Sequence, residues 1–329
     1  MNLFRLKNYI DTAVASTAAD SLTSFDFLQE EECLKWYVTG LIDAEGSFGV
    51  HLVKKDNNKT GYGVLVYFEI ALNKKDKNLL YIVQEVLGVR GELYYNQRDD
   101  TYKLKISNLL ELCNVIVPHF NKYPLFTQKR VDFLLMCQVL KILEDKRHLT
   151  LEGLREIVQL KSSMNLGLSD KLANDFPEIQ VLPRQIVSTG LPNLDWLSGF
   201  IEGEGCFFVS VYSSPKSKLK LAVQLVFKIT QHIRDVELLL NITKVLGCGR
   251  VETRRHGDAC DFAVTSFKEI DKSIIPYLSQ PRYRLKGLKL NNFKDFNKVY
   301  EMMARKEHLS EHGLGKIIEI KNGMNSARV

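Results

Sequence analysis

Long apolar segments, paired cysteines and a targeting signal are all missing from this sequence. Its longest apolar runs, such as Val-Leu-Val-Tyr-Phe at 64–68, are far shorter than the roughly 20 residues that a membrane-spanning helix needs. The six cysteines form no Cys-x-x-Cys pair and have no histidine at zinc-site spacing. Neither a disulfide framework nor a structural zinc site is therefore expected, and a reducing compartment is the default. No secretory core is visible, and acidic residues between 11 and 32 argue against a cleaved transit peptide.

The charge of the chain is modest but unevenly distributed. The 329 residues carry 45 Lys and Arg against 39 Asp and Glu, a formal charge of +6. A composition of 45% hydrophobic and 26% charged residues is typical of a folded globular protein with one large or two ordinary domains. The positive excess gathers in residues 51–105 and 206–264, whereas the remaining chain is nearly balanced. Two basic stretches at matched positions favour a polyanionic partner over an evenly solvated surface.

Two copies of one pattern occur along the chain. Gly-Leu-Ile-Asp-Ala-Glu-Gly-Ser-Phe at 40–48 recurs as Gly-Phe-Ile-Glu-Gly-Glu-Gly-Cys-Phe at 199–207, an offset of 159 residues. The same offset relates Phe-Glu-Ile at 68–70 to Phe-Lys-Ile at 227–229, and an offset of 160 relates Met-Asn at 164–165 to Met-Asn at 324–325. A nearly constant offset across both halves indicates a duplication.

The repeats divide the chain into four parts. We expect an N-terminal arm at 1–32, a first repeat at 33–165, a linker at 166–193 and a second repeat at 194–329. The linker holds three of the eight prolines, which block helix continuation and pairing in a central strand. The arm has no counterpart in the second half, and we expect it to be loose.

Each repeat is predicted to fold as αββαββα, an α+β class. The apolar segments at 33–44 and 194–203 predict helices, and those after Asp76 and Asp235 predict helices that end near Gly88 and Gly247. Alternating residues predict strands at 46–55, 62–73, 89–96 and 102–106, and at 206–213, 219–230, 249–254 and 260–264. Four antiparallel strands with helices on one face leave the opposite face either solvated or available for binding.

An acid stands at the end of each repeated helix. A carboxylate there faces the negative end of the helix dipole, at a cost of about 0.3–1 kcal/mol, so Glu45 and Glu204 need an explanation. Small residues four apart would let the two helices approach closely: Gly40, Ala44, Gly199 and Gly203. Such packing would bring the acids side by side, where a hard cation such as Mg²⁺ would relieve their repulsion. Two separate solvated acids, with glycines that only ease packing inside each half, are the alternative.

The two segments resemble a known motif. Val-Thr-Gly-Leu-Ile-Asp-Ala-Glu-Gly at 38–46 and Leu-Ser-Gly-Phe-Ile-Glu-Gly-Glu-Gly at 197–205 are similar to the LAGLIDADG motif. Over about residues 33–329 the chain resembles single-chain, two-repeat LAGLIDADG homing endonucleases, especially those of fungal mitochondrial introns. The resemblance implies two sheets that form a DNA-binding saddle.

The resemblance also implies site residues. Glu45 and Glu204 match the metal-binding catalytic acids, with the backbone carbonyls of Ala44 and Gly203 as further metal ligands. Asp43 and Glu202 match acids with a structural role in the family.

Further catalytic residues follow from the same resemblance. Lys129 and Lys286, each five residues after a proline, match the basic residue near the scissile phosphate, although solvated helix lysines are the alternative. Gln231 matches a water-positioning glutamine, whereas its counterpart Leu72 departs from the family pattern and leaves Asn73 as the substitute.

The strands carry the candidate DNA contacts. Hairpins with basic tips suit a β-ribbon in a DNA major groove, where tip residues contact phosphates and strand residues contact base edges. Ordinary polar hairpin tips are the alternative. The predicted contacts are Lys54, Lys55, Lys59, Tyr67, Glu69, Lys216, Lys218, Lys220, Lys228, Arg254 and Arg255.

Together these features predict a monomeric, Mg²⁺-dependent endodeoxyribonuclease that cuts both strands of a long non-palindromic site of about 20 base pairs. We expect Mn²⁺ to substitute and Ca²⁺ to support binding without efficient cleavage. The resemblance implies a mitochondrial, intron-encoded protein. An intron RNA maturase, alone or as a second activity, is the main alternative, with host intron RNA as its partner. A DNA binder without catalysis would have lost at least one acid, and both are present.

Overall fold

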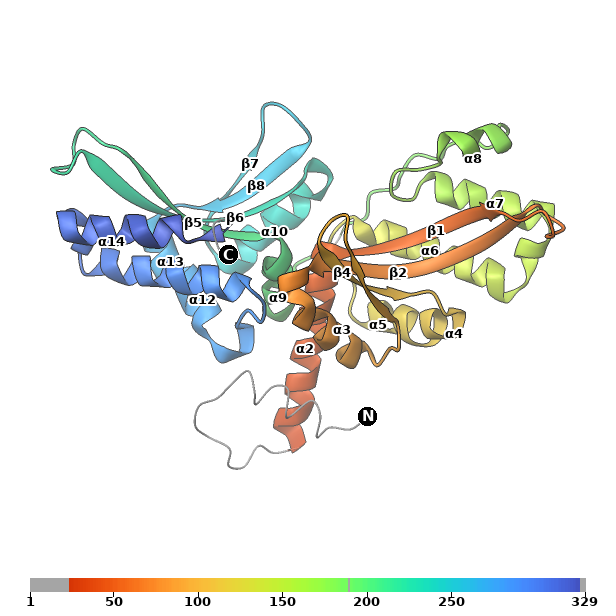
Figure 1. The fold of residues 1–329 in the computed structure, drawn as a ribbon, viewed down its shortest axis with the longest axis horizontal. Helices are drawn as coiled ribbons and strands as arrows, with labels where there is room; N and C mark the ends of the chain where they lie inside the picture. Colours follow the sequence, from red (N-terminus) through yellow and green to blue (C-terminus); the bar gives the residue numbers. More distant parts are fainter. Residues whose placement is uncertain (1–23, 189, 326–329) are drawn as a thin grey trace. The chain divides into compact units, whose positions relative to one another are not determined.

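A computed structural model describes residues 24–188 and 190–325 (Figure 1). They fall into two compact units. The N-terminal unit comprises described residues 24–39, 45–124 and 129–185, and the C-terminal unit comprises 40–44, 125–128 and the described residues from 186 onward. Among the helices of the described chain, none combines the length and the apolar character needed to cross a membrane.

The N-terminal unit follows the predicted element order. Its elements, with α2 running on into residues of the C-terminal unit, are α2 (Ser24–Glu45), β1 (Gly46–Lys54), β2 (Tyr62–Asn73), α3 (Lys77–Leu87), β3 (Glu92–Asn96), β4 (Thr101–Ile106), α4 (Leu109–Glu111), a π-helical segment (Leu112–Ile116), α5 (Val117–Lys122), α6 (Lys129–Glu144), α7 (Leu151–Ser162) and α8 (Asp170–Asp175). The strands form one antiparallel sheet in the order β1-β2-β4-β3.

The C-terminal unit repeats this arrangement. Its elements are α9 (Leu194–Glu204), β5 (Gly205–Ser213), β6 (Leu221–His232), α10 (Val236–Leu246), β7 (Arg250–Thr253), β8 (Ala259–Val264), α11 (Phe267–Glu269), a π-helical segment (Ile270–Ile274), α12 (Ile275–Ser279), α13 (Lys289–Ala304) and α14 (Glu311–Asn322). The sheet order β5-β6-β8-β7 matches the first sheet, and Gly205 pairs with Ile229 as Gly46 pairs with Ile70. The predicted α+β repeat is confirmed.

Burial alternates along the central strands, as the sequence predicted. Val66, Phe68 and Ile70 of β2 are buried under the helices, whereas Leu65, Tyr67 and Glu69 point to the opposite face. We call this opposite side of each sheet its open face. It consists of the strand positions that alternate with the core residues. For the C-terminal sheet, Figure 1 shows α12, α13 and α14 below the strands.

Clusters of phenylalanines hold each sheet to its helices. In the N-terminal unit Phe48 packs against Phe68, Phe120 and Phe133, with ring centroids 5.2–5.4 Å apart. In the C-terminal unit Phe207 packs in the same way against Phe227, Phe293 and Phe296. Removing one such buried ring typically costs about 3–5 kcal/mol, so these clusters fix the position of each sheet.

Helix α2 begins earlier than predicted. It starts at Ser24, so residues 24–32, expected in a loose arm, form helical turns continuous with the first motif. Glu32 explains part of this extension, because its carboxylate accepts hydrogen bonds from the Tyr123 hydroxyl at 2.5 Å and from Lys122 at 3.4 Å. The rest of the predicted arm lies outside the described residues.

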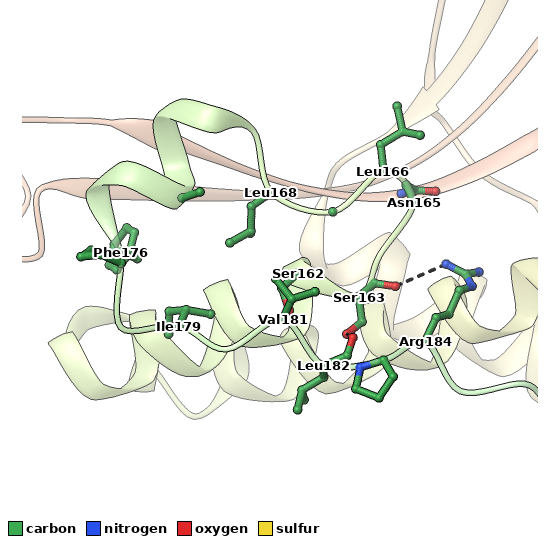
Figure 2. A pocket seen from close by; sticks show the side chains of 14 residues that line it. Ser162, Ser163, Asn165, Leu166, Leu168, Phe176, Ile179, Val181, Leu182 and Arg184 are labelled. Atoms are coloured by element: carbon green, nitrogen blue, oxygen red, sulfur yellow. Dashed lines mark hydrogen bonds between the residues drawn. The ribbon is translucent and has the colours of Figure 1, made fainter.

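The linker contains a helix that the sequence analysis missed. Leu172 of α8 and Phe176 just after it pack against Leu154 and Val158 of α7, which buries apolar surface. The nearby prolines had hidden this helix in the sequence pattern. Beside them, residues 162–184 surround a pocket of about 590 Å³, in which Arg184 donates a hydrogen bond to the carbonyl of Ser163 (Figure 2). None of the residues lining this pocket belongs to either motif. The linker is therefore a packed part of the N-terminal unit up to about residue 185.

Candidate active site and nucleic-acid interface

Glu45 and Glu204 are the last residues of α2 and α9, and a strand begins at the next residue in both cases. Glu45 is exposed and Glu204 is half-buried. Glycine follows Glu204 for a steric reason, since a Cβ at Gly205 would lie 2.6 Å from Ile201 Cγ2 and 2.7 Å from its carbonyl oxygen. The motif glycine thus permits a direct turn from helix to strand that leaves the acid at the junction.

Asp43, the sixth residue of the first motif, is buried and fully engaged. Its carboxylate accepts hydrogen bonds from the backbone N–H of Phe126 at 2.5 Å, from the Thr127 hydroxyl at 2.6 Å and from the Trp196 indole at 3.1 Å. Such bonds to a charged acceptor are stronger than those between neutral groups. Asp43 therefore braces the motif helix within the C-terminal unit.

Glu202 occupies the same motif position in α9. It is buried, and its carboxylate accepts a hydrogen bond from the backbone N–H of Lys286 at 2.7 Å. Both sixth-position acids therefore accept from backbone amides, as expected for structural residues.

Gly40 sits where no side chain fits. A Cβ at this position would lie 1.9 Å from the Trp196 carbonyl oxygen and 2.8 Å from the Phe200 backbone nitrogen. Gly40 thus lets this part of α2 approach the α9 backbone, the close packing proposed for the small motif residues. Of the other small motif residues, Ala44 and Gly203 are half-buried and Gly199 is buried.

The structure adds Lys289 to the candidate residues. Lys129 begins α6, and the residue that begins the equivalent helix α13 is Lys289, not Lys286. The hydrogen bond from Asn165 N–H to Asp132 recurs from Asn325 N–H to Asn292, which fixes the offset between these helices at 160 residues. The Met-Asn repeat carried this offset in the sequence, but the proline-to-lysine spacing obscured it.

Lys289 lies directly beside the end of the second motif helix. Its ammonium donates hydrogen bonds to the carbonyl oxygens of Gly203 at 3.2 Å and Gly205 at 2.5 Å, on both sides of Glu204. A cation there also complements the negative end of the α9 dipole. The side chain of Lys286, three residues earlier, is exposed.

Gln231 and Leu72 occupy the same place in the two sheets. Each lies two residues beyond the strand residue that pairs with a motif glycine. Gln231 is half-buried and donates a hydrogen bond to the Thr230 carbonyl at 2.9 Å, whereas Leu72 is only 7% exposed and apolar. The polar group at this position is therefore present in one unit and replaced by a core residue in the other.

The open face of the N-terminal sheet carries a stacked cluster around Tyr67. His51 lies parallel to the Tyr67 ring at 5.2 Å, and the Lys105 ammonium lies 4.7 Å from the ring centroid. Burial, together with the nearby charges of Lys161 and Lys105, lowers the pKa of His51. On the same face Glu69 accepts hydrogen bonds from Tyr94 at 3.1 Å and Lys103 at 3.4 Å.

The open face of the C-terminal sheet centres on Asp261. Its carboxylate lies 2.8 Å from Lys228 and accepts hydrogen bonds from Arg254 at 2.9 Å and Thr230 at 2.6 Å. Burial alone would raise the pKa of Asp261, but the hydrogen bonds and charges of these partners hold it well below its usual range. Two of the predicted DNA contacts are therefore held in place by one carboxylate.

Most of the predicted DNA contacts lie on the open faces or at hairpin tips. Tyr67, Glu69 and Lys228 belong to the faces, and the exposed tip residues are Lys55, Lys59, Lys216, Lys218, Lys220, Arg254 and Arg255. Lys54 lies apart from the other tip residues. It pairs across the strands with Tyr62 on the helix-covered side, and its ammonium lies 3.0 Å from Asp175 of α8. Lys54 therefore contacts the linker helix, and its role as a phosphate contact stays a prediction.

Each motif end carries donors of the kind that a hard divalent cation prefers. Glu45 and Glu204 supply carboxylate oxygens, the ligands that Mg²⁺ and Ca²⁺ prefer, and the Ala44 carbonyl lies in the last helical turn. The Gly203 carbonyl, also predicted as a ligand, accepts from Lys289 instead.

Comparison with known proteins gives this arrangement a family. The model of the LAGLIDADG endonuclease family matches residues 38–140 and 197–300, both motifs with the strands that follow them. This chain belongs to the LAGLIDADG endonuclease family. It is 36% identical over 299 residues to probable intron-encoded endonuclease 2 of Neurospora crassa, an alignment that covers 88% of this chain and 64% of that protein. The chain thus spans less than two thirds of that relative's length.

Two solved LAGLIDADG structures share the whole fold. The I-LtrWI LAGLIDADG homing endonuclease bound to target DNA is 54% identical with a TM-score of 0.88, covering 91% of this chain and 100% of that one. I-SmaMI bound to an uncleaved DNA target in the presence of calcium ions is 38% identical with a TM-score of 0.84, covering 88% and 98%. The resemblance seen in the sequence is confirmed, and the names of these proteins do not favour the maturase alternative.

Proposed function

We propose that this protein is a homing endonuclease that cuts both strands of DNA at one long, non-palindromic site and acts as a monomer. One observation carries the proposal. Each motif helix ends in an acid, Glu45 or Glu204, and passes directly into a sheet whose open face bears basic and aromatic side chains. A catalytic acid is thus covalently joined to a surface suited to a duplex.

In this proposal Glu45 and Glu204 hold Mg²⁺, with the Ala44 carbonyl as a further ligand. The cation supplies Lewis-acid stabilisation of charge on the phosphate oxygens. Mn²⁺ substitutes for it, and Ca²⁺ allows binding without efficient cleavage, in line with its looser coordination.

The lysines stabilise negative charge at the scissile phosphates. Lys129 serves one strand and Lys289 the other, because they begin equivalent helices and Lys289 contacts both carbonyls that flank Glu204. Exposed Lys286 is a second candidate for the same role. Gln231 orients a water molecule in the second repeat, where its amide is half-buried at the end of β6, and Asn73 substitutes for it in the first repeat.

The repeats at 33–165 and 194–329 each bind one half of the target. The open faces enter the major groove, and the hairpin-tip cations contact phosphates, which sets the register of the protein on DNA. Two of the relatives are probable intron-encoded endonucleases of the fungus Neurospora crassa, which supports a mitochondrial, intron-encoded origin for this chain too.

The decisive test is selection of cleaved sites from a randomised duplex library with Mg²⁺, followed by cleavage of the selected site by Glu45→Gln and Glu204→Gln. We expect each variant to bind DNA within a few-fold of wild type in Ca²⁺ and to lose double-strand cleavage by at least about 10²–10³. Near-normal cleavage by either variant would overturn the metal assignment. Failure to select any cleaved site would overturn the function.

A second experiment assigns the lysines to strands. Lys129→Met and Lys289→Met should each slow cleavage by about 10²–10³, each on a different strand, because each removes one charge-stabilising group. Lys286→Met, which tests the second candidate, should slow the strand that depends on Lys289 less than Lys289→Met does. Gln231→Leu, which copies Leu72, should slow that same strand. A plasmid time course with strand-specific end labels resolves nicked and linear products. Equal slowing of both strands by each variant would mean that the centre works as one coupled unit.

A further inference from the structure

Equivalent positions on the two open faces carry opposite chemistry. In the N-terminal unit Tyr67 lies flat across Gly49, where a Cβ would be only 2.3 Å from its ring. His51 stacks on this ring and Lys105 lies above it, so hydrogen-bonding groups surround the position. Only the missing side chain at Gly49 allows the ring to lie down.

The C-terminal unit has an apolar patch at the same place. Phe208 stands where Gly49 stands and pairs across the strands with Val226, the counterpart of Tyr67. Ala263, opposite Lys228, takes the place of Lys105, which is opposite Glu69. Phe208 is half-buried, while Val226 and Ala263 are each only 6% exposed. We call these three residues the Phe208 patch.

The Phe208 patch lies apart from the main core. That core lies on the other side of the sheet, where Phe207, Phe227 and Phe262 are fully buried. Ser210, Gln224 and Lys228, at neighbouring positions of the open face, are polar. The half-buried Phe208 ring is thus an apolar group beside polar ones, which points to an apolar ligand group.

DNA offers one such group in its major groove. The C5 methyl of thymine is the only apolar feature on a base edge there, whereas purines present N7 and, in guanine, O6 acceptors. A phenylalanine ring on a strand fits the methyl, and a lysine ammonium fits the acceptors.

We infer that the Phe208 patch selects thymine in the half-site held by the C-terminal unit, and that the Tyr67 cluster (His51, Tyr67 and Lys105) selects a purine at the equivalent position of the other half-site. This inference rests on the proposed DNA-cleaving function and specifies its target. The two half-sites therefore differ at equivalent positions because Gly49 and Phe208 differ.

The test uses chemically altered DNA with the wild-type protein, so it does not depend on a variant folding. Within the target selected from the library, each thymine is replaced singly by deoxyuridine, which removes only the methyl group. Dissociation constants are measured in Ca²⁺. At the thymine touching the Phe208 patch we expect about fourfold weaker binding, the value of one buried methyl-sized group.

A matched variant then assigns the effect to its residue. Phe208→Ala should bind the thymine and deoxyuridine targets equally. Its loss of affinity for the thymine target, relative to wild type, should match the loss that deoxyuridine causes in wild type. In the other half-site, 7-deazapurine substitution should weaken wild-type binding by about tenfold at one position, and Lys105→Met should abolish that difference.

The possible results distinguish failure of the base-selection inference from failure of the proposed DNA-cleaving function. If a target is selected and cut but no deoxyuridine weakens binding in the half-site of the C-terminal unit, the inference is wrong and the endonuclease proposal stands. If a deoxyuridine effect persists in Phe208→Ala, the contact belongs to another residue and the inference is also wrong. If no DNA is bound or cut, the function itself fails.

Discussion

The two sheets have the same register, yet one charge pair is reversed between them. Glu69 and Lys228 occupy the same place, each opposite the residue that follows a motif glycine. Their partners Lys103 and Asp261 are also equivalent, opposite Ala71 and Thr230. The N-terminal unit thus pairs Glu69 with Lys103, and the C-terminal unit pairs Lys228 with Asp261. The scaffold requires a pair of opposite charges there but not a particular order of the charges.

The packing around the linker differs more strongly. Asp132 is buried and accepts two hydrogen bonds from the Arg184 guanidinium, at 2.8 and 2.6 Å, besides one from the Asn165 amide. Asn292 takes the equivalent place in the C-terminal unit and keeps the amide contact with Asn325. A neutral side chain therefore accepts the same amide hydrogen bond in the C-terminal unit.

Breaking the Asp132–Arg184 pair should have the largest effect on stability. Arg184→Met leaves a buried carboxylate without its main partner, which should lower the unfolding free energy of the N-terminal unit by about 3–5 kcal/mol. Adding Asp132→Asn, which copies Asn292, should recover most of the loss. The measurement is denaturant unfolding followed by Trp36 fluorescence in a Trp196→Phe background, since Trp36 lies in this unit and packs on Tyr123. A double variant no more stable than Arg184→Met alone would contradict this comparison of Asp132 with Asn292.

A second difference predicts unequal sensitivity to acid. His119 Nε2 lies 2.9 Å from the Thr39 hydroxyl, and removal of the ring from water lowers the pKa of His119 to about 3. Tyr277, its counterpart in the C-terminal unit, donates to the Leu194 carbonyl at 2.7 Å, and burial raises its pKa far above neutrality. Only the N-terminal unit therefore contains a group at this position that titrates in acid.

Above about pH 6.5 His119 is neutral in both the folded and the unfolded chain, so its protonation does not lower the unfolding free energy. Between pH 6.5 and about 3 the unfolded chain binds a proton that the folded unit excludes, so stability falls as pH falls. By pH 4.5 the loss should reach about 2–3 kcal/mol. Unfolding of wild type and His119→Tyr between pH 4.5 and 7.5 measures it, because the shared carboxylate titrations cancel in the difference. Parallel pH profiles for the two proteins would refute the prediction.

The smallest expected effect concerns the reversed pair itself. Asp261→Asn removes a charge that holds both Lys228 and Arg254, whereas among the described cations Glu69→Gln releases Lys103 alone. Because these cations are partly exposed, we expect each loss of stability to be only about 1 kcal/mol. Asp261→Asn should bind non-specific DNA more tightly than wild type, and the slope of log affinity against log salt concentration should steepen by about one. Glu69→Gln should change this slope less. Equal slopes for the two variants would show that Lys228 and Arg254 do not reach phosphates.

Local pattern was enough to place most of the elements. The alternation along 62–73 predicted β2 at its observed bounds, Tyr62–Asn73, and Gly88 and Gly247 do end α3 and α10 in the left-handed conformation. These features depend on near neighbours in the chain. Helix α8 was missed because Leu172 and Phe176 become a helix face only against α7, which lies earlier in the chain.

The features of the candidate site also divide into those set by near neighbours in the chain and those set by distant segments. The amino-acid sequence by itself determined the duplication, the helix-end acids Glu45 and Glu204, and the faces of the strands, because a repeat offset and a two-residue period are visible in one dimension. Only the tertiary structure decided that Lys289 donates to the carbonyls on both sides of Glu204, that Lys54 pairs with Asp175, and that Trp196 donates to Asp43. Each of these partners comes from a segment distant in the chain, and hydrogen bonds form only where folding brings such segments within about 3 Å.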